Sequence, residues 1–416
     1  MPDSITIGID SIAFAVPHRY VELSELARAR GVDPAKFTTG LGCRRMAVTD
    51  PGEDTVALAA TAAHRLIAQT GIDRARIGLL IVGTETGVDH SKPVASHVQG
   101  LLGLPRTMRV FDTTHACYGG TAGLMTACEW IASGVARGRV AIVICSDVAR
   151  YGVGTPGEPT QGAGAIAMLV TEAPRVVAID VGASGVSSAD VYDFWRPHGR
   201  REAVVDGHYS IECYLEALAE AYRGWCGHAR ERGWTAATSA EGAAHGLARI
   251  VYHVPFPRMA HKAHAHLVRI ERDEATGDPT QPIDPSVVAG RYEQQVAPSL
   301  RVCAEIGNSY TGSLYFGLLG LLESEAHALA NLRIGMFSYG SGCVSEFFSG
   351  VVQRHAARAI AVTRTTEILG ARTPIGIDEY ERLLALPADA PLAIAPAPGG
   401  YRLAAIRDHR RIYVAG

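Results

Sequence analysis

The amino-acid sequence predicts an α/β protein built from two related halves. Short apolar stretches alternate with longer helical ones along the chain, which is typical of β-sheets covered by helices. A similar order of elements also occurs twice, once after residue 115 and once after residue 307. The length of 416 residues is enough for one large core or for two related ones.

Strands and helices are expected where apolar runs and helical periodicity are clearest. The expected strands are Ile5–Asp10, Ile77–Gly83, Arg109–Asp112, Val140–Cys145 and Ala165–Val170. The expected helices are Thr55–Thr70, Tyr118–Ser133, Tyr209–Cys226 and Tyr310–Glu323.

The internal repeat consists of a small-residue helix start followed by two strands. Its copies are 116–121, Val140–Cys145 and Ala165–Val170, then 308–313, Ile334–Ser338 and Val344–Val352. Cys117 lies 28 positions before Cys145 (145 − 117), and Ser309 lies 28 positions before Phe337 (337 − 309). We expect two βαβ-type units whose helix starts face each other, with the site at those helix N-termini. Coincidental spacing in an ordinary α/β protein is the alternative.

The composition excludes several classes of protein. Hydrophobic residues make up 47% and charged residues 19% of the chain, and the net charge is −3. This profile indicates a soluble globular protein without general attraction to nucleic acid or to an anionic membrane. Apolar runs such as 142–145 and 317–322 are shorter than the roughly 18 residues of a membrane span. Met1–Asp10 has no basic stretch followed by an apolar one, so we expect no secretory signal.

Eight cysteines are scattered along the chain without a CxxC pair. This spacing argues against a zinc site, and a chain of this length needs no disulfide framework. We therefore expect reduced cysteines and a cytoplasmic protein. His261, His264 and His266 lack a nearby carboxylate or cysteine, so no metal site is expected there either.

Cys117 is the strongest candidate nucleophile. It follows the strand expected at 108–112 and stands in or near the first turn of the next helix. The helix dipole and free N–H groups there favour a thiolate over a thiol. Gly119 and Gly120 cost about 1 kcal/mol each relative to Ala in a helix, so we expect a substrate or another backbone to approach them closely. The alternative, an inert buried cysteine, fits Cys128 better because that residue lies inside an apolar element.

Two further polar residues follow expected strands. Glu85 comes after the apolar run 77–83, at the carboxyl end of a strand, where ligands bind in open α/β sheets. A partly dehydrated carboxylate there has a raised pKa and can act as a general acid or base. His253 follows the strand-like run 249–252 and is a candidate catalytic donor. A solvated loop glutamate and a satisfied core histidine are the alternatives.

Two glycine-rich loops remain, Tyr339–Gly342 after a strand and Gly162–Gly164 before one. Neither matches the dinucleotide fingerprint GxGxxG, and the chain contains no GxxxxGK[ST] phosphate loop. The loop at 339–342 is better suited to present backbone N–H groups to an oxyanion.

Nine short runs share their residues and their order with one family. They are Gly83–Glu85, Ala116–Thr121, Ser146–Tyr151, Gly157–Gly164, Tyr192–Pro197, Val205–Gly207, His253–Phe256, Gly307–Ser313 and Phe337–Gly342. Together with 408–413 they span nearly the whole chain, and they resemble hydroxymethylglutaryl-CoA synthases. A single run of this kind is weak evidence, whereas nine in order are not a coincidence.

The resemblance implies a thiolase-like fold, in which two repeated βαβ-type halves form a layered αβαβα arrangement. The expected halves are residues 1–172, which carry the nucleophile, and 173–416, which carry a histidine and an asparagine of the site. It also implies a homodimer and an acyltransferase that forms a carbon–carbon bond without a cofactor.

The implied reaction begins when Cys117 takes the acetyl group of acetyl-CoA. Glu85 then removes a proton from the acetyl methyl group. The resulting carbon nucleophile attacks the ketone of acetoacetyl-CoA, which His253 polarises. Water finally releases 3-hydroxy-3-methylglutaryl-CoA, the product that this family supplies to the mevalonate pathway of isoprenoid biosynthesis.

The resemblance also implies supporting roles. The N–H groups of Cys117 and Ser341 hold the thioester oxygen, and Asn308 positions the acceptor. Lys262 lies in a segment that contacts the phosphates of CoA. Family positions that tune or orient the site are matched by Asp147, Asp193 and Tyr339.

The carrier of the acyl groups stays open. His115, where many family members have Asn or Glu, and the run 342–348 resemble homologues that install β-branches on polyketides and use acyl carrier proteins. The runs at 192–197, 205–207 and 255–262 instead resemble the CoA-using enzymes of the mevalonate pathway, which is the preferred interpretation. A non-catalytic scaffold of thiolase fold is a third hypothesis.

Overall fold

The centre of the protein is one mixed sheet of ten strands. The computed structural model describes residues 6–234, 246–387, 390 and 399–416. The strand order is β12-β13-β14-β8-β1-β7-β6-β4-β5, and β9 pairs with β14. The first half of the chain contributes β1 (Ile7–Ala15), β4 (Ile77–Gly83), β5 (Arg109–Thr113), β6 (Val140–Ala149) and β7 (Gly162–Glu172). The second half contributes β8 (Val177–Ile179), β9 (Gly185–Ser188), β12 (Leu247–Tyr252), β13 (Arg333–Gly340) and β14 (Val344–Val352).

The pairing pattern repeats within the sheet. In the first half β4 is parallel to β6, β6 is antiparallel to β7, and β7 is antiparallel to β1. In the second half β12, β13, β14 and β8 pair in the same sequence of directions. The two β1-like strands, β1 and β8, pair antiparallel and join both halves into one continuous sheet. The repeat expected from the sequence is therefore present in the hydrogen-bonding pattern.

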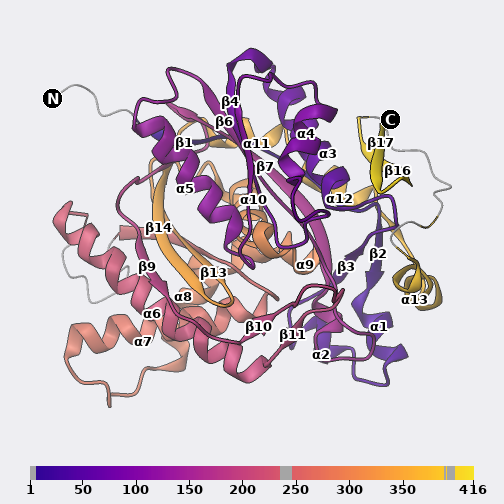
Figure 1. Ribbon diagram of the computed structural model, residues 1–416. Coiled ribbons are helices and arrows are strands. Elements are labelled where there is room, and N and C mark those ends of the chain that lie inside the picture. The colour runs from indigo at the N-terminus through magenta and orange to yellow at the C-terminus, as the bar shows by residue number, and fades with distance from the viewer. Residues whose placement is uncertain (1–5, 235–245, 388–389, 391–398) are drawn as a thin grey trace.

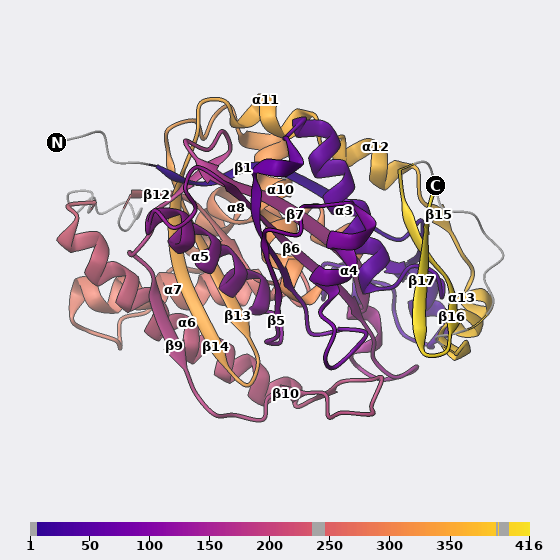
Figure 2. The same ribbon diagram turned by 45° about the horizontal axis from the view of Figure 1, so that its top comes forward.

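Helices cover the sheet in layers, as Figures 1 and 2 show. The outer layers are α3 (Thr55–Thr70) with α4 (Val94–Leu101), and α6 (Gly207–Glu231) with α7 (Arg258–Thr276). Between the sheet halves lie α5 (Gly119–Ala132) and α10 (Ser313–Glu325). Strand β1 illustrates the division, because Ala13 and Ala15 pack in the core under α3 whereas Ile12 and Phe14 face the central helices. The layered αβαβα arrangement is confirmed.

Local sequence signals explain where the helices begin and end. The α3 helix matches its expected range because the Asp54 side chain accepts from Ala57 N at 2.9 Å and Gly71 ends the helix in the left-handed region. The α6 helix starts earlier than expected, since Asp206 caps it. The last expected helix divides into a 3-10 turn (Tyr310–Gly312) and α10.

Most expected strands are present, some with longer ranges. Residues 77–83 and 344–352 match the prediction, and Ile5 lies outside the described residues. Strand β6 continues past Cys145 to Ala149. Its polar residues Ser146 and Asp147 are buried and find hydrogen-bond partners on neighbouring segments, so they do not end the strand.

Smaller elements surround this core. A three-stranded sheet of β15 (Thr373–Pro374), β2 (Arg19–Glu22) and β3 (Arg45–Val48) packs with α1 (Leu23–Ala29), α2 (Ala35–Thr38) and α13 (Ile377–Ala385). The remaining elements are β10 (Phe194–Trp195), β11 (Val204–Val205), α8 (Pro285–Gln295), α9 (Cys303–Ile306), α11 (Ala356–Ala361), α12 (Thr365–Gly370), β16 (Tyr401–Arg407) and β17 (Arg410–Ala415). None of the helices in the described ranges has the length and apolar character of a membrane span.

Candidate active site

The repeated strand and helix ends converge on one cavity. Glu85 follows β4, His253 follows β12, and Cys117 and Asn308 precede α5 and α10. A cavity of about 200 Å³ is lined by five of the residues predicted for the site: Cys117, His253, Asn308, Tyr339 and Ser341. Glu85 completes the group through its contact with Cys117. The predicted core of the site is therefore assembled from both halves of the chain.

Cys117 lies two positions before α5 in a left-handed conformation, with φ of 52°. Around it, Gly120 and Gly340 lie so close to other parts of the protein that only glycine fits at these two positions. A Cβ on Gly120 would lie 2.4 Å from Cys145 Sγ and 2.8 Å from Thr311 O, and one on Gly340 would lie 1.9 Å from Ala116 O. The predicted close approach at Gly120 is confirmed, and another part of the protein makes it. The contact at Gly340 also brings the 339–342 loop against the Cys117 loop.

Glu85 and Cys117 form the central contact of the site. Glu85 Oε1 accepts from Cys117 N at 3.1 Å and lies 3.5 Å from Cys117 Sγ. Burial, reinforced by the Asp147 carboxylate, raises the pKa of Glu85 to about 8. The same contact occupies the Cys117 N–H that was predicted to hold the thioester oxygen.

The expected thiolate at Cys117 is wrong for this structure. Burial, together with the carboxylates of Glu85 and Asp147, raises the pKa of the Cys117 thiol well above its ordinary value. These effects outweigh the helix dipole because Cys117 stands outside the first turn and beside acidic groups, whereas a dipole acts mainly within that turn. Cys117 and Glu85 thus form a pair in which both partners favour the protonated, neutral form.

Asp147 connects the two halves beneath this pair. Its carboxylate is fully buried and accepts from Glu85 N at 2.9 Å and from Thr311 N at 3.1 Å. It also accepts from the hydroxyl groups of Thr84, Thr86 and Thr311. These bonds satisfy a buried charge and fix the backbone of Glu85 relative to the start of α10.

His253 faces the cavity from the second half. Its backbone N–H donates to Phe337 O at 2.7 Å, and its backbone carbonyl accepts from Tyr214 Oη at 2.8 Å. Among the described residues its Nδ1 has no hydrogen-bond partner. Burial lowers the pKa of His253 to about 3, so the ring is neutral at physiological pH and can donate through one nitrogen only.

Asp193 and Tyr339 hold the loop that carries Ser341. Tyr339 Oη donates to Asp193 Oδ2 at 2.7 Å, and Gly342 N donates to Asp193 Oδ1 at 3.0 Å. Ser210 Oγ, on α6, donates to the same carboxylate at 3.2 Å. Asp193 therefore bonds on both sides of Ser341 and orients its backbone toward the cavity.

The Asn308 side chain forms one hydrogen bond to the backbone, in which its Oδ1 accepts from Tyr310 N at 2.8 Å. An aromatic wall that the sequence analysis did not single out stands beside it. Tyr151, Phe194 and Tyr310 pack edge to face, with ring centroids 5.8 to 6.5 Å apart, next to Cys117. Each lies in one of the nine family runs, but aromatic residues are common in cores and gave no separate signal.

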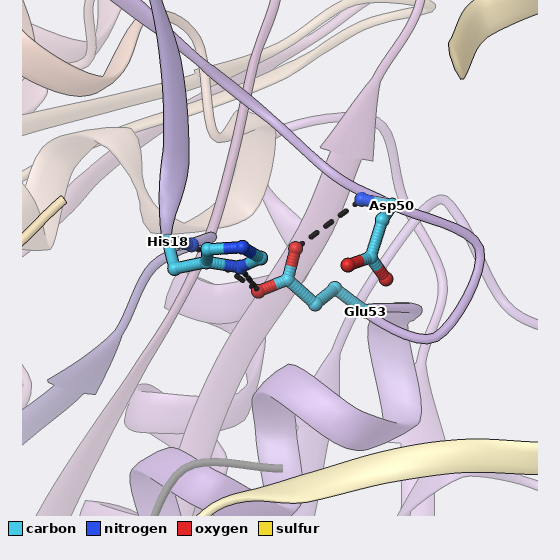
Figure 3. A group of neighbouring side chains, drawn as sticks. All are labelled: His18, Asp50 and Glu53. Carbon is cyan, nitrogen blue, oxygen red and sulfur yellow. Dashed lines mark hydrogen bonds and ion pairs between the residues drawn. The ribbon is translucent and has the colours of Figure 1, made fainter. Parts of the chain in front are cut away.

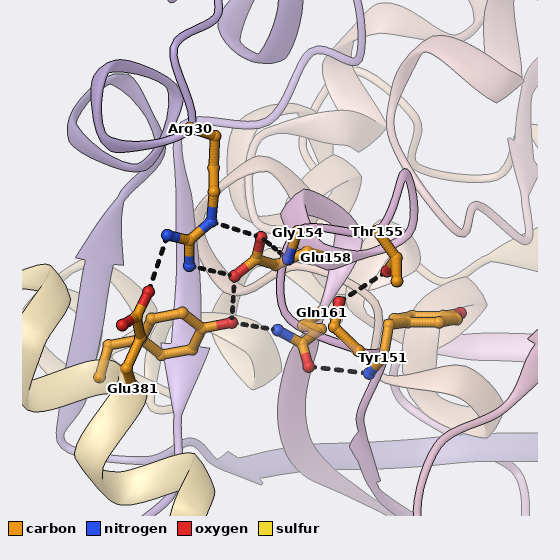
Figure 4. Close-up of polar contacts among 9 residues, drawn as sticks. Arg30, Tyr151, Gly154, Thr155, Glu158, Gln161 and Glu381 are labelled. Carbon is orange, nitrogen blue, oxygen red and sulfur yellow. Dashed lines mark hydrogen bonds and ion pairs between the residues drawn. The ribbon is translucent and has the colours of Figure 1, made fainter.

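The connection between β6 and β7, residues 150–161, forms another part of the cavity wall, and a polar network holds it (Figure 4). Glu158 is buried and accepts from Arg30 Nε at 2.8 Å, from Gly154 N at 2.8 Å and from Tyr380 Oη at 3.1 Å. The Gln161 side chain bonds to the same hydroxyl group. The network ties this connection to α1 and α13.

Lys262 is exposed on α7 and does not line the cavity; Met259, one turn earlier, does. A different cluster has the composition of a metal site: His18, Asp50 and Glu53 (Figure 3). Its members already have protein partners, because His18 Nδ1 lies 3.0 Å from Glu53 Oε1 and Asp50 pairs with Arg402. The described residues therefore place no metal-binding group beside Cys117.

Comparison with known proteins decides the family. The family model for the N-terminal part of hydroxymethylglutaryl-coenzyme A synthase matches residues 3–174. The model for the C-terminal part matches 177–282 and 270–390. The chain belongs to the hydroxymethylglutaryl-CoA synthase family. A hydroxymethylglutaryl-CoA synthase of Enterococcus faecalis is 39% identical over 381 residues, 92% of each chain.

Solved structures of the family agree with this assignment. MvaS in complex with 3-hydroxy-3-methylglutaryl coenzyme A has a TM-score of 0.95 and 60% identity over 99% of this chain and 100% of its own. The hydroxymethylglutaryl synthase of the curacin biosynthetic pathway has a TM-score of 0.88 at 30% identity, with the same coverage of both chains. The protein is thus a carbon–carbon bond-forming acyltransferase of the mevalonate type with a thiolase-like fold, as predicted.

Proposed function

We propose that the protein condenses acetyl-CoA with acetoacetyl-CoA, with Cys117, Glu85 and His253 as its catalytic residues. The observation that carries the proposal is the 3.5 Å contact between Cys117 Sγ and Glu85 Oε1 beside the cavity that His253 faces. A nucleophile, a base and a donor around one small cavity are the groups that a thioester condensation needs.

The first step transfers the acetyl group. Cys117 Sγ attacks the carbonyl carbon of acetyl-CoA, and the bond from that carbon to the CoA sulfur breaks. Because the Cys117 thiol is protonated at rest, its proton passes to the departing CoA sulfur as the new carbon–sulfur bond forms, without the help of Glu85. The acetyl-enzyme then has no thiol proton to share with Glu85.

The second step forms the carbon–carbon bond. Ionised Glu85 removes a methyl proton while the N–H groups of Ser341 and Cys117 stabilise the enolate oxygen. The Cys117 N–H exchanges its hydrogen bond to Glu85 Oε1 for one to this oxygen as the oxygen becomes negatively charged. The methyl carbon attacks the ketone of acetoacetyl-CoA. His253 donates a hydrogen bond to the ketone oxygen as it becomes an alkoxide, and the proton that Glu85 took from the methyl group passes to that oxygen to form the hydroxyl group. Asn308 holds the acceptor.

The last step consumes water. It cleaves the thioester on Cys117, restores the thiol and leaves a carboxylate at that end of 3-hydroxy-3-methylglutaryl-CoA. Asp147, Asp193 and Tyr339 act by positioning Glu85 and the Ser341 loop. Lys262, which is exposed on α7 outside the cavity wall, contacts the CoA phosphates.

The proposal extends to the organisation of the protein. Its halves are residues 1–172 and 173–416, and it works in the cytoplasm without a cofactor. Strand β5 supports a homodimer: it is an edge of the sheet, paired only with β4 among the described residues. The same strand of a second copy would complete its hydrogen bonding under two-fold symmetry.

Intact-mass spectrometry after incubation with acetyl-CoA tests the chemistry. We expect one acetyl group on the wild-type protein and none on Cys117→Ser. Unmodified wild-type protein would support a non-catalytic scaffold instead. Turnover of free acetoacetyl-CoA, compared with the same acyl group on an acyl carrier protein, tests the carrier. Activity restricted to the carrier protein would contradict the proposed substrates and favour the polyketide β-branching type, for which a curacin-pathway relative has been solved with its donor carrier protein.

A further inference from the structure

A second, larger cavity lies on the other side of Glu85 from the Cys117 cavity. Its volume is about 780 Å³, and its wall includes Glu85, Ala116 and Phe194. Phe194 belongs to both cavities, and Ala116 is adjacent in sequence to Cys117. Glu85 lines the second cavity and contacts Cys117, which lines the first, so this pair forms the partition between the two cavities.

The walls of the two cavities differ in polarity. The Cys117 cavity is lined mainly by aromatic and apolar side chains, among them Tyr151, Tyr214 and Phe256. The second cavity is lined by polar and charged groups, including five arginines: Arg150, Arg196, Arg200, Arg201 and Arg411. Water is stable in a polar cavity of this size and unstable in a small apolar one.

The charges of the second cavity do not cancel. Three of its five acidic residues are paired: Glu53 with His18 (Figure 3), Asp50 with Arg402, and Asp54 with Arg411. Of the other two, Asp89 accepts from the backbone N–H groups of Ser91 and Lys92, and Glu85 contacts Cys117. In contrast, no carboxylate of the described residues lies within ion-pair distance of the four arginines Arg150, Arg196, Arg200 and Arg201. The wall thus offers unpaired cations to an anion.

Two of these arginines are linked to the site. Arg196 donates to the carbonyl oxygen of Glu85, which places its guanidinium beside the partition. Arg150 directly follows β6, the strand that carries Asp147. Burial, together with the Arg201 charge, lowers the pKa of Arg150 to about 10, because the opposing attraction of the Glu202 carboxylate is smaller.

The final step of the proposed function makes two demands at Cys117. A water molecule must reach the thioester carbon, and the carboxylate formed there must be accommodated. Under the proposed function the thioester arm of the product occupies the Cys117 cavity at that moment, which leaves the second cavity as the open route for water. The polar cavity behind Glu85 meets both demands, because it holds water and carries unpaired positive charge.

We infer that the second cavity is the hydrolytic side of the active site: it supplies the attacking water and binds the nascent carboxylate through Arg150 and Arg196. The inference rests on the proposed function. In the step it serves, water oxygen bonds to the thioester carbon and the bond to Cys117 Sγ breaks. One water proton returns to the sulfur, and the other is released as the product acid ionises.

Rapid-quench intact-mass spectrometry tests the inference. The full-length protein is first acetylated with acetyl-CoA and then mixed with acetoacetyl-CoA, and the covalent product–enzyme adduct is followed in time. Arg150→Gln removes one unpaired cation. Gly87→Phe obstructs the cavity from its wall, where an added Cβ meets no atom within 4 Å. Matched controls are Arg354→Gln and Gly290→Phe, both at exposed positions outside the two cavities.

In Arg150→Gln and Gly87→Phe we expect unchanged acetylation, accumulation of the adduct, and release roughly ten-fold slower or more. The controls should release product at the wild-type rate. Release at the control rate in both variants, without adduct, overturns the inference and leaves the proposed function intact. Failure of the wild-type protein to become acetylated overturns the proposed function itself, and this inference with it.

Discussion

The two halves of the molecule use the same backbone for different chemistry. In each half a residue with left-handed backbone precedes a central helix: Cys117 with φ of 52° and Tyr310 with φ of 47°. The sequence spacing had matched Cys117 with Ser309, one position away. With the backbone match, Cys145 and Ser338 again lie 28 residues further on (145 − 117 and 338 − 310). The first half places a nucleophile at this point and the second an aromatic wall.

The strand ends differ in the same way. Glu85 follows β4 in the first half and His253 follows β12 in the second. Burial affects both in the direction of neutrality, because it raises the pKa of Glu85 to about 8 and lowers that of His253 to about 3. A duplicated fold has thus placed a neutral acid and a neutral base on either side of Cys117. At physiological pH only Glu85 is close enough to its pKa to exchange a proton readily.

Of the two residues at the strand ends, Glu85 should matter more for condensation, so the largest effect is expected for Glu85→Ala. The variant should still accept an acetyl group, because Cys117 remains, while formation of 3-hydroxy-3-methylglutaryl-CoA falls by about 10³-fold. Acetylation is measured by intact mass and condensation by product formation. Glu231→Ala, an exposed position on α6, serves as control. A variant that fails to acetylate would contradict the division of labour between Glu85 and Cys117.

His253→Ala should have a smaller effect, about 10²-fold on condensation, again with normal acetylation. Because the ring is neutral, an amide at this position can replace part of its hydrogen bonding, so His253→Gln should exceed His253→Ala in activity. His228→Ala, at a partly exposed position on α6 away from the cavity, controls for a general loss of histidine. Equal activities of the Gln and Ala variants would indicate that the donor is an imidazolium.

Much of this comparison could be predicted from the sequence, because it depends on order and spacing. The repeat, the central helices and the strand-end positions of Glu85 and His253 follow from apolar runs bounded by polar residues. The continuous sheet could not be predicted in this way, since the pairing of β1 with β8 joins segments whose sequences do not encode a partner. Asp193 entered the site only through the family resemblance, and its contacts with Tyr339 and Gly342 span almost 150 positions.

The sequence predicted a lowered pKa for the Cys117 thiol, whereas the structure raises it. A helix terminus is a local feature that can be seen in the sequence, whereas the buried carboxylates of Glu85 and Asp147 reach Cys117 through tertiary structure. Arg150 and Arg196 were missed for the same reason. Their importance lies in having no carboxylate partner among the described residues, and no sequence pattern reports that.

The pH dependence of condensation sharpens the contrast between Glu85 and His253. Only the ionised form of Glu85 can take the methyl proton. Since its folded pKa is raised to about 8, the rate with pre-acetylated protein should rise roughly tenfold per pH unit below that value and level off above it. With the pKa of His253 lowered to about 3, no second inflection is expected between pH 5 and 7. Stopped-flow measurement of product formation gives the profile, and a bell shape centred near neutrality would contradict it.

The smallest expected effect concerns the connections that close each half over the cavity. The β13–β14 turn, residues 341–343, is short and fixed by Asp193, whereas the 150–161 connection is long and depends on Glu158 and its partners (Figure 4). Tyr380→Phe removes the hydroxyl group that bridges Glu158 and Gln161, at a cost of about 1 kcal/mol in the free energy of unfolding.

Because Tyr380 does not touch the reacting atoms, its loss should loosen the cavity wall at Pro156, Gly157 and Thr160 without changing the chemistry. We expect KM for acetyl-CoA to rise roughly three-fold, with kcat near its wild-type value. Tyr401→Phe, which removes a hydroxyl group in the C-terminal hairpin, is the matched control and should leave KM unchanged. An equal fall of kcat in Tyr380→Phe would mean that the long connection takes part in the reaction and does more than bind the substrate.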